Sequence, residues 1–260
     1  GFLPDDPPNA ALTGLVGAAW SLAVQQAIMG HQVEIVAPGQ QSACRTIAGV
    51  KVQWLAPWSS LHTARYDFSF LAPLLLFTLR SPAVDVTHVH GNPYFLTRFR
   101  SRARVLHVHD LSIQPSPSMN QAVARADRVI CCSNFIRTRF LGTVAYPPSQ
   151  AETVPNGADR QTYAQVNRTS ARAALGIPDD QFIMLYAGRI GPEKGLLVLI
   201  EALEKIITQN GSPAMLARLT GKWPPLLLVA GSATLGFEGY PAAWQERQAY
   251  AQQVCQRTQD

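Results

Sequence analysis

One stretch of the sequence, Phe182–Ile207, constrains the fold more than any other. It opens with an uninterrupted apolar run, which is typical of a parallel strand that is covered on both faces. A glycine-containing turn with charged residues follows, and from Leu196 apolar residues recur at helical spacing. A buried strand, a turn and a helix in this order predict an α/β fold.

The turn in this stretch carries two cations, Arg189 and Lys194. It lies at the carboxyl end of the predicted strand and near the start of the predicted helix. Open α/β sheets bind ligands at that edge, and exposed N–H groups at a helix start attract anions. We therefore predict that Arg189 and Lys194 form a phosphate clamp. The alternative is a solvated turn whose charges only keep the surface polar.

Strand and helix patterns also alternate through the preceding part of the chain, which predicts a parallel, doubly wound sheet. The predicted strands are residues 31–38, 50–55, 84–90, 105–109, 128–132 and 152–155. The predicted helices are residues 18–29, 65–79 (interrupted by Pro73), 94–100, 121–126 and 134–140.

The pattern lapses into an irregular polar stretch at residues 159–180, where we predict a boundary between domains 1–160 and 161–260. Beyond Ile207 the sequence predicts one more strand, at 226–230, and an amphipathic helix at 244–258. Two strands and two helices cannot cover a second sheet, so we expect this second domain to be incomplete.

A glycine-bearing loop is predicted before the first helix, with Gly14 and Gly17 in it. Such a loop lets the backbone approach a phosphate, or else only lets the helix start pack closely. No strand pattern precedes the loop, and the sequence has no initiator methionine. We therefore expect the first strand of this domain to be missing.

Two pairs of histidines stand near strand ends, His88 with His90 and His107 with His109. Residues two apart share a face of a strand, so each pair presents two imidazoles together. Apart from Asp110, no carboxylate or cysteine completes a ligand set, so we expect no metal. An acid, a base or a hydrogen-bond donor to a sugar hydroxyl fits better, with His109 the preferred candidate. The alternative is a structural histidine.

The composition, 47% hydrophobic and 15% charged, fits a well-buried enzyme core and excludes a disordered chain. A net charge of +5 suits a phosphate-bearing ligand or an anionic membrane surface. No aromatic-interleaved basic run or zinc spacing appears, so we expect no nucleic-acid binding. A basic run at Arg98, Arg100, Arg102 and Arg104 is interpreted as a solvated helix end and loop, or as a contact with lipid headgroups.

The four cysteines form no C-x-x-C pair, and the longest apolar stretch, at residues 68–79, is too short to span a bilayer. We therefore expect a reduced, cytoplasmic protein, with the membrane surface as the alternative location.

Six motifs, taken in order, resemble those of one enzyme family, the retaining glycosyltransferases of family 4, which have the GT-B fold. The similar segments are Gly30–Pro38 (GHQVEIVAP), Asp85–Gly91 (DVTHVHG), Val105–Asp110 (VLHVHD), Ala126–Ser133 (ADRVICCS), Val154–Asp159 (VPNGAD) and Ala187–Gly195 (AGRIGPEKG).

The resemblance implies two Rossmann-like domains, an acceptor-side domain at 1–160 and part of a nucleotide-sugar donor domain at 161–260. It implies that Arg189 and Lys194 bind the donor diphosphate, and that Gly14 and Gly17 lie near the donor phosphates and the acceptor. His109 would face the reacting sugar and hydrogen-bond it. The family's paired glutamates and base pocket are expected beyond Asp260.

The expected activity is transfer of a sugar, with retention, from a nucleotide-sugar donor to a carbohydrate or lipid-linked acceptor. No metal or other cofactor is expected, because Arg189 and Lys194 supply the positive charge at the leaving diphosphate. The alternatives are a non-catalytic nucleotide-binding or interaction module and a sugar-nucleotide epimerase.

Overall fold

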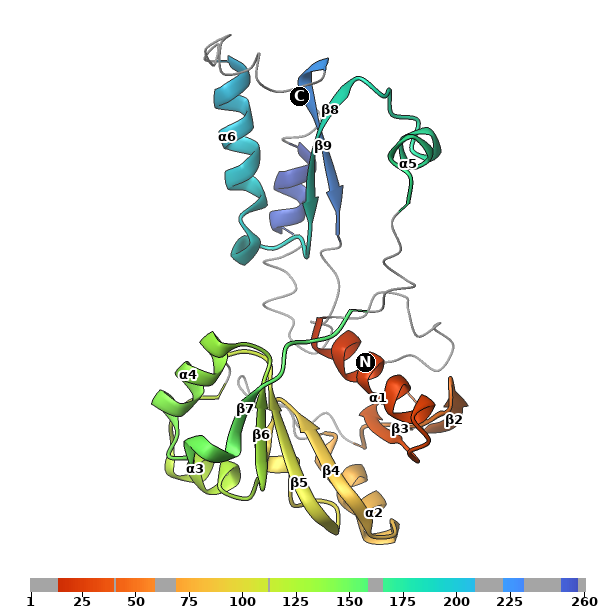
Figure 1. Cartoon of the computed structure of the whole chain (residues 1–260), viewed down its shortest axis with the longest axis vertical. Coiled ribbons are helices and arrows are strands. Elements are labelled where there is room, and N and C mark those ends of the chain that lie inside the picture. The colour runs from red at the N-terminus through yellow and green to blue at the C-terminus, as the bar shows by residue number, and fades with distance from the viewer. Residues whose placement is uncertain are drawn as a thin grey trace. The chain divides into compact units, whose positions relative to one another are not determined.

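The structure is a computed structural model that describes residues 14–39, 41–58, 69–111, 113–158, 166–208, 222–231 and 249–256. The chain divides into two compact units, unit 1 (Gly1–Asp159) and unit 2 (Arg160–Asp260). Both combine helices with strands (Figure 1). No helix in the described ranges has the length and apolar character needed to cross a membrane.

Unit 1 begins with a helix packed on a small sheet. The elements are α1 (Gly14–Ile28), β1 (Glu34–Pro38), β2 (Ala43–Ile47) and β3 (Val50–Leu55). The strand order is β1-β3-β2, in which β1 is parallel and β2 antiparallel to β3. Trp20 and Ala23, three residues apart on α1, are buried with Val50, Val52 and Trp54.

A second sheet in unit 1 has four strands, and each neighbouring pair is parallel. Its strands are β4 (Val84–His90), β5 (Ser101–Val108), β6 (Arg128–Cys131) and β7 (Ala151–Thr153). The helical elements are α2 (Leu71–Arg80), η1 (Pro93–Phe95), α3 (Pro117–Val123), α4 (Asn134–Thr143) and η2 (Pro148–Gln150). Leu106 and Val108 of β5 are buried with Val123 of α3 and Phe140 of α4, so these helices cover one face of the sheet.

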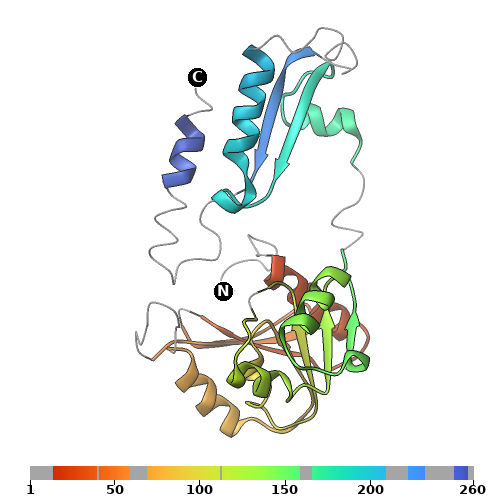
Figure 2. The ribbon, with the colours of Figure 1, turned by 90° about the vertical axis from the view of Figure 1, so that its left-hand side faces the viewer.

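Unit 2 is built on a parallel strand pair. It contains α5 (Arg168–Ala174), β8 (Gln181–Ala187), η3 (Pro192–Lys194), α6 (Leu196–Thr208) and β9 (Lys222–Ala230). Residues 249–256 form a further helical segment. Leu196 and Ile200 of α6 are buried with Tyr250 and Val254 of that segment. The views in Figures 1 and 2 show α6 on one side of the strand pair and α5 on the other.

The α/β class and the parallel strand pairing are confirmed, and strands 50–55 and 84–90 have the predicted bounds. The predicted helix at 94–100 is wrong, since only η1 forms there. The residues that follow join β5, because Ser101 and Ala103 pair with Val84 and Val86 of β4. The antiparallel strand β2 was not predicted.

Two further expectations are corrected. The stretch 159–180 contains α5, whose start is capped by the Asn167 side chain, which accepts hydrogen bonds from the backbone N–H groups of Thr169 and Ser170. Pro73 does not interrupt α2, because it lies in the first turn, where its missing N–H has no intrahelical partner. Residues 65–68, 244–248 and 257–258 of the predicted helices lie outside the described residues.

Candidate functional site

Four imidazoles gather at the carboxyl ends of β4 and β5. His90 is the register partner of His107, and the alternation along each strand places His88 and His109 on the same face. Ring centroids of successive neighbours are 4.5 Å apart for His88 and His90, 5.0 Å for His90 and His107, and 4.1 Å for His107 and His109. The two histidine pairs predicted separately therefore form a single cluster.

The cluster has few hydrogen-bond partners. Nδ1 of His90 and Nε2 of His109 lie 2.9 Å apart and share one hydrogen. The Cys132 thiol donates to the carbonyl oxygen of His109, with Sγ and O 3.3 Å apart. Both ring nitrogens of His107 and Nε2 of His88 are buried without a hydrogen-bond partner. Such buried polar atoms are uncommon in folded proteins.

Burial keeps these imidazoles neutral. It lowers the pKa of His88 to about 4 and those of His90 and His107 to about 3, and the neighbouring histidines add to the effect. Burial also lowers the pKa of His109, against a smaller opposing effect of Asp110. A neutral imidazole both donates and accepts hydrogen bonds, but with so low a pKa it is a weak base at neutral pH.

A hollow of about 460 Å³ lies beside the end of β5, on the side of α4. Its lining includes Val108, Asp110, Arg139 and Phe140. This volume falls within the range of small-molecule sites.

Gly14 and Gly17 do not lie in a loop as predicted; both belong to α1. The helix extends to Gly14 because apolar residues follow it at once, and a glycine at a helix end costs less than one in the interior. The start of α1 lies close to the end of β4, since a Cβ added to Gly91 would sit 3.7 Å from Cδ1 of Leu15. The first turn of α1 has backbone N–H groups without intrahelical partners.

The predicted clamp lies in unit 2, in the turn between β8 and α6. Arg189 forms an ion pair with Glu193, with Nη2 and Oε1 3.7 Å apart, and Lys194 is exposed in η3. The Tyr186 hydroxyl donates to the carbonyl oxygen of Arg189 at 2.7 Å and so ties the turn back to its strand. Gly195 ends η3 with φ of 68°, a conformation that strongly favours glycine.

The start of α6 is less open to an anion than expected. The N–H of Leu197, in its first turn, donates to the Tyr250 hydroxyl at 2.9 Å, so this group is already satisfied. This N–H is therefore not available to an anion. At the neighbouring strand end, a Cβ on Gly231 would overlap the carbonyl oxygen of Gly188, so β9 needs glycine there to approach the turn.

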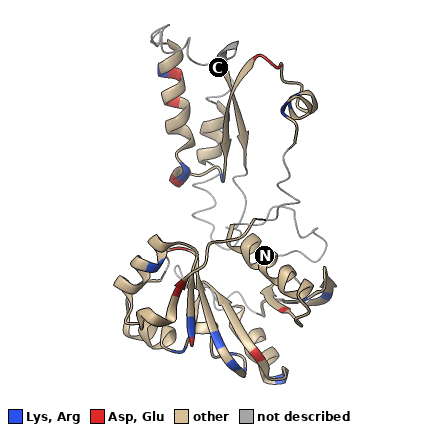
Figure 3. Ribbon diagram, in the orientation of Figure 1, with Lys and Arg blue, Asp and Glu red and all other residues tan. Residues whose placement is uncertain are grey.

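The prediction of a helix end and loop for the basic run is only partly right: Arg98 and Arg100 lie in irregular backbone before β5, but Arg102 and Arg104 belong to β5. Figure 3 shows these positive positions along β5, with a negative position on neighbouring β4. Arg102 forms an exposed ion pair with Asp85, with Nη1 and Oδ1 3.4 Å apart. Arg100 donates to the carbonyl oxygen of Ser81, just after α2.

The structure brings Arg189 and Lys194 together in one turn, while His109, Gly14 and Gly17 belong to the other unit. The contact between the histidine pairs was not predicted, although two adjacent parallel strands ending in His-x-His were a usable signal. The supporting roles of two tyrosines, Tyr186 and Tyr250, were not predicted either, because nothing local in the sequence shows where their hydroxyl groups bond.

Known proteins resemble this chain in sequence and in fold. The sequence pattern of Glycosyltransferase Family 4 matches residues 13–162. A D-inositol 3-phosphate glycosyltransferase from Actinosynnema mirum is 28% identical over 245 residues, covering 82% of this chain and 57% of the relative. A lipopolysaccharide 1,2-N-acetylglucosaminetransferase from Salmonella typhimurium is 29% identical over 153 residues, covering 58% of this chain and 38% of the relative.

The fold matches that of HepE from Anabaena, solved in complex with UDP-glucose, with a TM-score of 0.58 and 16% sequence identity. The match covers 98% of this chain and 64% of HepE. The prediction of a GT-B fold is thereby confirmed. Since the family pattern matches more than half of the 260 residues, the chain belongs to Glycosyltransferase Family 4.

Proposed function

We propose that this chain serves to transfer a sugar, with retention, from a nucleotide-sugar donor to a carbohydrate or lipid-linked acceptor. The observation that carries the proposal is the turn after β8, which holds Arg189 and Lys194 together at the carboxyl end of a parallel strand. HepE, which has the same fold, was solved with UDP-glucose bound, and this supports a nucleotide diphosphate as the ligand.

In this proposal Arg189 and Lys194 bind the donor diphosphate and stabilise the negative charge that grows on it as the sugar leaves. The ion pair with Glu193 orients the Arg189 guanidinium, while exposed Lys194 reaches the phosphates as a point charge. Since two cations supply this charge, the transfer step needs no metal or other cofactor.

Unit 1 provides the acceptor side, and unit 2 the donor side. His109 hydrogen-bonds the reacting sugar, a role that suits an imidazole kept neutral by burial. Gly14, at the start of α1, presents its backbone N–H to phosphate or acceptor, and Gly17, one turn further on, has no side chain to block a close approach. The hollow beside Asp110 provides space for an acceptor.

We also propose a cytoplasmic location, with contact to an anionic membrane surface. Cys44, Cys131 and Cys132 form no disulfide, as expected in a reducing compartment. At the end of α2, Leu79 is 80% exposed next to Arg80, and the Arg100 side chain bonds to the segment that follows. An apolar side chain flanked by cations suits the surface of an anionic bilayer.

The clamp can be tested by calorimetric titration of UDP and of inorganic pyrophosphate into the full chain. Charged hydrogen bonds are worth about 1.5–3 kcal/mol, so Arg189→Ala and Lys194→Ala should each weaken binding by about tenfold or more. Lys205→Ala is the matched control, because Lys205 is an exposed cation of the same unit near the other end of α6. Equal affinities in all three variants would overturn the clamp.

Activity separates transfer from the alternatives. We expect wild-type protein to release UDP from UDP-glucose in the presence of EDTA, and the sugar product to keep the donor's anomeric configuration by NMR. Tight binding of UDP without turnover would favour the non-catalytic module, and a change of configuration at another sugar carbon would favour the epimerase.

A further inference from the structure

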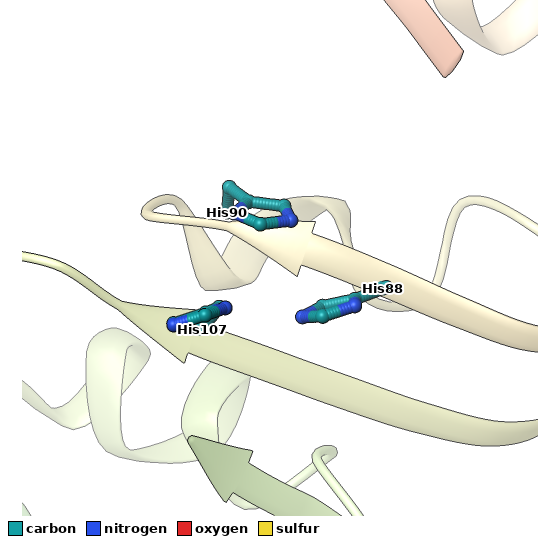
Figure 4. A group of neighbouring side chains, drawn as sticks. All are labelled: His88, His90 and His107. Atoms are coloured by element: carbon teal, nitrogen blue, oxygen red, sulfur yellow. The ribbon is translucent and has the colours of Figure 1, made fainter. Parts of the chain in front are cut away.

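The histidine cluster offers three ligands where the sequence offered only pairs. His88 and His90 come from β4 and His107 from β5 (Figure 4). One nitrogen from each ring lies within 4.8 Å of the others. We propose that His88, His90 and His107 bind one zinc-class divalent cation.

The donor atoms are available for an ion. His107 is only 6% exposed, and neither of its ring nitrogens has a hydrogen-bond partner; Nε2 of His88 is buried and equally unpartnered. A buried polar atom without a partner costs about as much as a lost hydrogen bond, which a metal–nitrogen bond would recover.

The fourth histidine supports the site from outside. The hydrogen bond between Nε2 of His109 and Nδ1 of His90 occupies that nitrogen of His90, so Nε2 of His90 is left for the ion. Histidine ligands commonly use their second nitrogen in this way, which fixes the tautomer and the ring orientation. His88 and His90 are only half-buried, which leaves a path for an ion to enter.

The chemistry of the donors selects the ion. Three imidazoles suit zinc and similar borderline cations, whereas magnesium and calcium prefer oxygen. Tetrahedral zinc at about 2.0–2.1 Å from each nitrogen requires nitrogens about 3.3 Å apart. The nitrogens now lie 4.8 Å apart or less, and rotation of the rings about their Cβ–Cγ bonds, which are soft torsions, can shorten these distances. A fourth position stays open for water or an anion.

The test titrates zinc into untagged, chelator-treated protein against a chromophoric zinc indicator. We expect one saturable site, and His107→Asn and His88→Asn should each bind zinc at least about tenfold more weakly. His31→Asn, at an exposed histidine before β1, is the matched control and should bind like wild type. Absence of a saturable site, or equal affinity in His107→Asn and His31→Asn, would overturn the proposal.

Two further measurements keep the test decisive if a variant folds poorly. Cobalt(II) in the wild-type site should give visible bands of a tetrahedral ion without the strong near-ultraviolet charge-transfer band of cysteine ligation. A hundredfold excess of zinc over its Kd should raise the Tm by about 5–10 °C, since the ion links β4 to β5, while magnesium should not. A thiolate band, or equal shifts with zinc and magnesium, would assign the binding elsewhere.

Discussion

The hydroxyl of Tyr186 supports the turn of the proposed clamp, and this role can be tested by removing a single atom. It donates to the carbonyl oxygen of Arg189 at 2.7 Å and closes the turn three residues after its own position in β8. The substitution Tyr186→Phe removes this bond and keeps the ring, which packs against the core of unit 2. We expect the Arg189 turn to lose part of its preference for the observed conformation.

The expected loss of stability in Tyr186→Phe depends on how strong this hydrogen bond is and on whether water can replace it. An intramolecular hydrogen bond of this kind contributes about 0.5–1.5 kcal/mol net. Arg189 is only half-buried, so water can reach its carbonyl oxygen in the variant and the desolvation penalty is small. A loss of about 1 kcal/mol is the central expectation for stability. Because binding requires the ordered turn, the same loss sets an upper limit of about fivefold on the fall in ligand affinity.

Two measurements on Tyr186→Phe test this reasoning, urea unfolding followed by circular dichroism and calorimetric titration of inorganic pyrophosphate. Tyr94→Phe makes the same chemical change in unit 1, where an exposed hydroxyl bonds Ser118 at 3.0 Å, and should leave pyrophosphate affinity unchanged. If Tyr186→Phe matches wild type in both stability and affinity, the hydroxyl does not order the turn. A loss of affinity far above fivefold would instead require direct contact of the hydroxyl with the ligand.

Two further predictions concern unit 1. Leu106→Ala removes three carbon atoms from a fully buried site, so we expect the free energy of unfolding to fall by about 2.4 kcal/mol from lost burial and by up to about 5 kcal/mol with the cavity. Leu79→Ala, at an 80% exposed site, should change the free energy of unfolding in urea by less than about 0.5 kcal/mol. Equal losses in the two variants would contradict the assigned core. The double variant Arg80→Glu/Arg100→Glu should bind vesicles rich in anionic lipid at least about tenfold more weakly than wild type in sedimentation. Undiminished binding would refute the membrane contact.

The buried strands could be predicted because their chemistry is local. Val84–His90 and Val50–Leu55 are short apolar or alternating runs bounded by turns, and both formed as expected. What failed depended on partners elsewhere in the chain. Arg102 and Arg104 look like a solvated segment, yet they extend β5 because β4 offers backbone partners along its whole length. Tertiary pairing overrides local propensity in such segments.

The residues of the candidate site could be predicted from the sequence, whereas most of the contacts between them could not. The positions of Arg189 and Lys194 in one turn follow from the strand, the glycines and the helix around them. The bond of Leu197 to Tyr250 joins residues 53 positions apart, and no local pattern signals it. Gly14 and Gly17 were misplaced because a glycine near a helix start is compatible with both a loop and a first turn.

The histidine cluster and the core of unit 1 depend on the same alternation along β5. Leu106 and Val108 face α3 and α4, while His107 points to the opposite side with the other imidazoles. A slip of β5 by one residue would exchange these faces. It would take Leu106 and Val108 out of the apolar core that they form with α3 and α4, and would press imidazoles into that core. The apolar residues of β5 therefore hold the imidazoles in register, although none of them contributes a polar atom to the cluster.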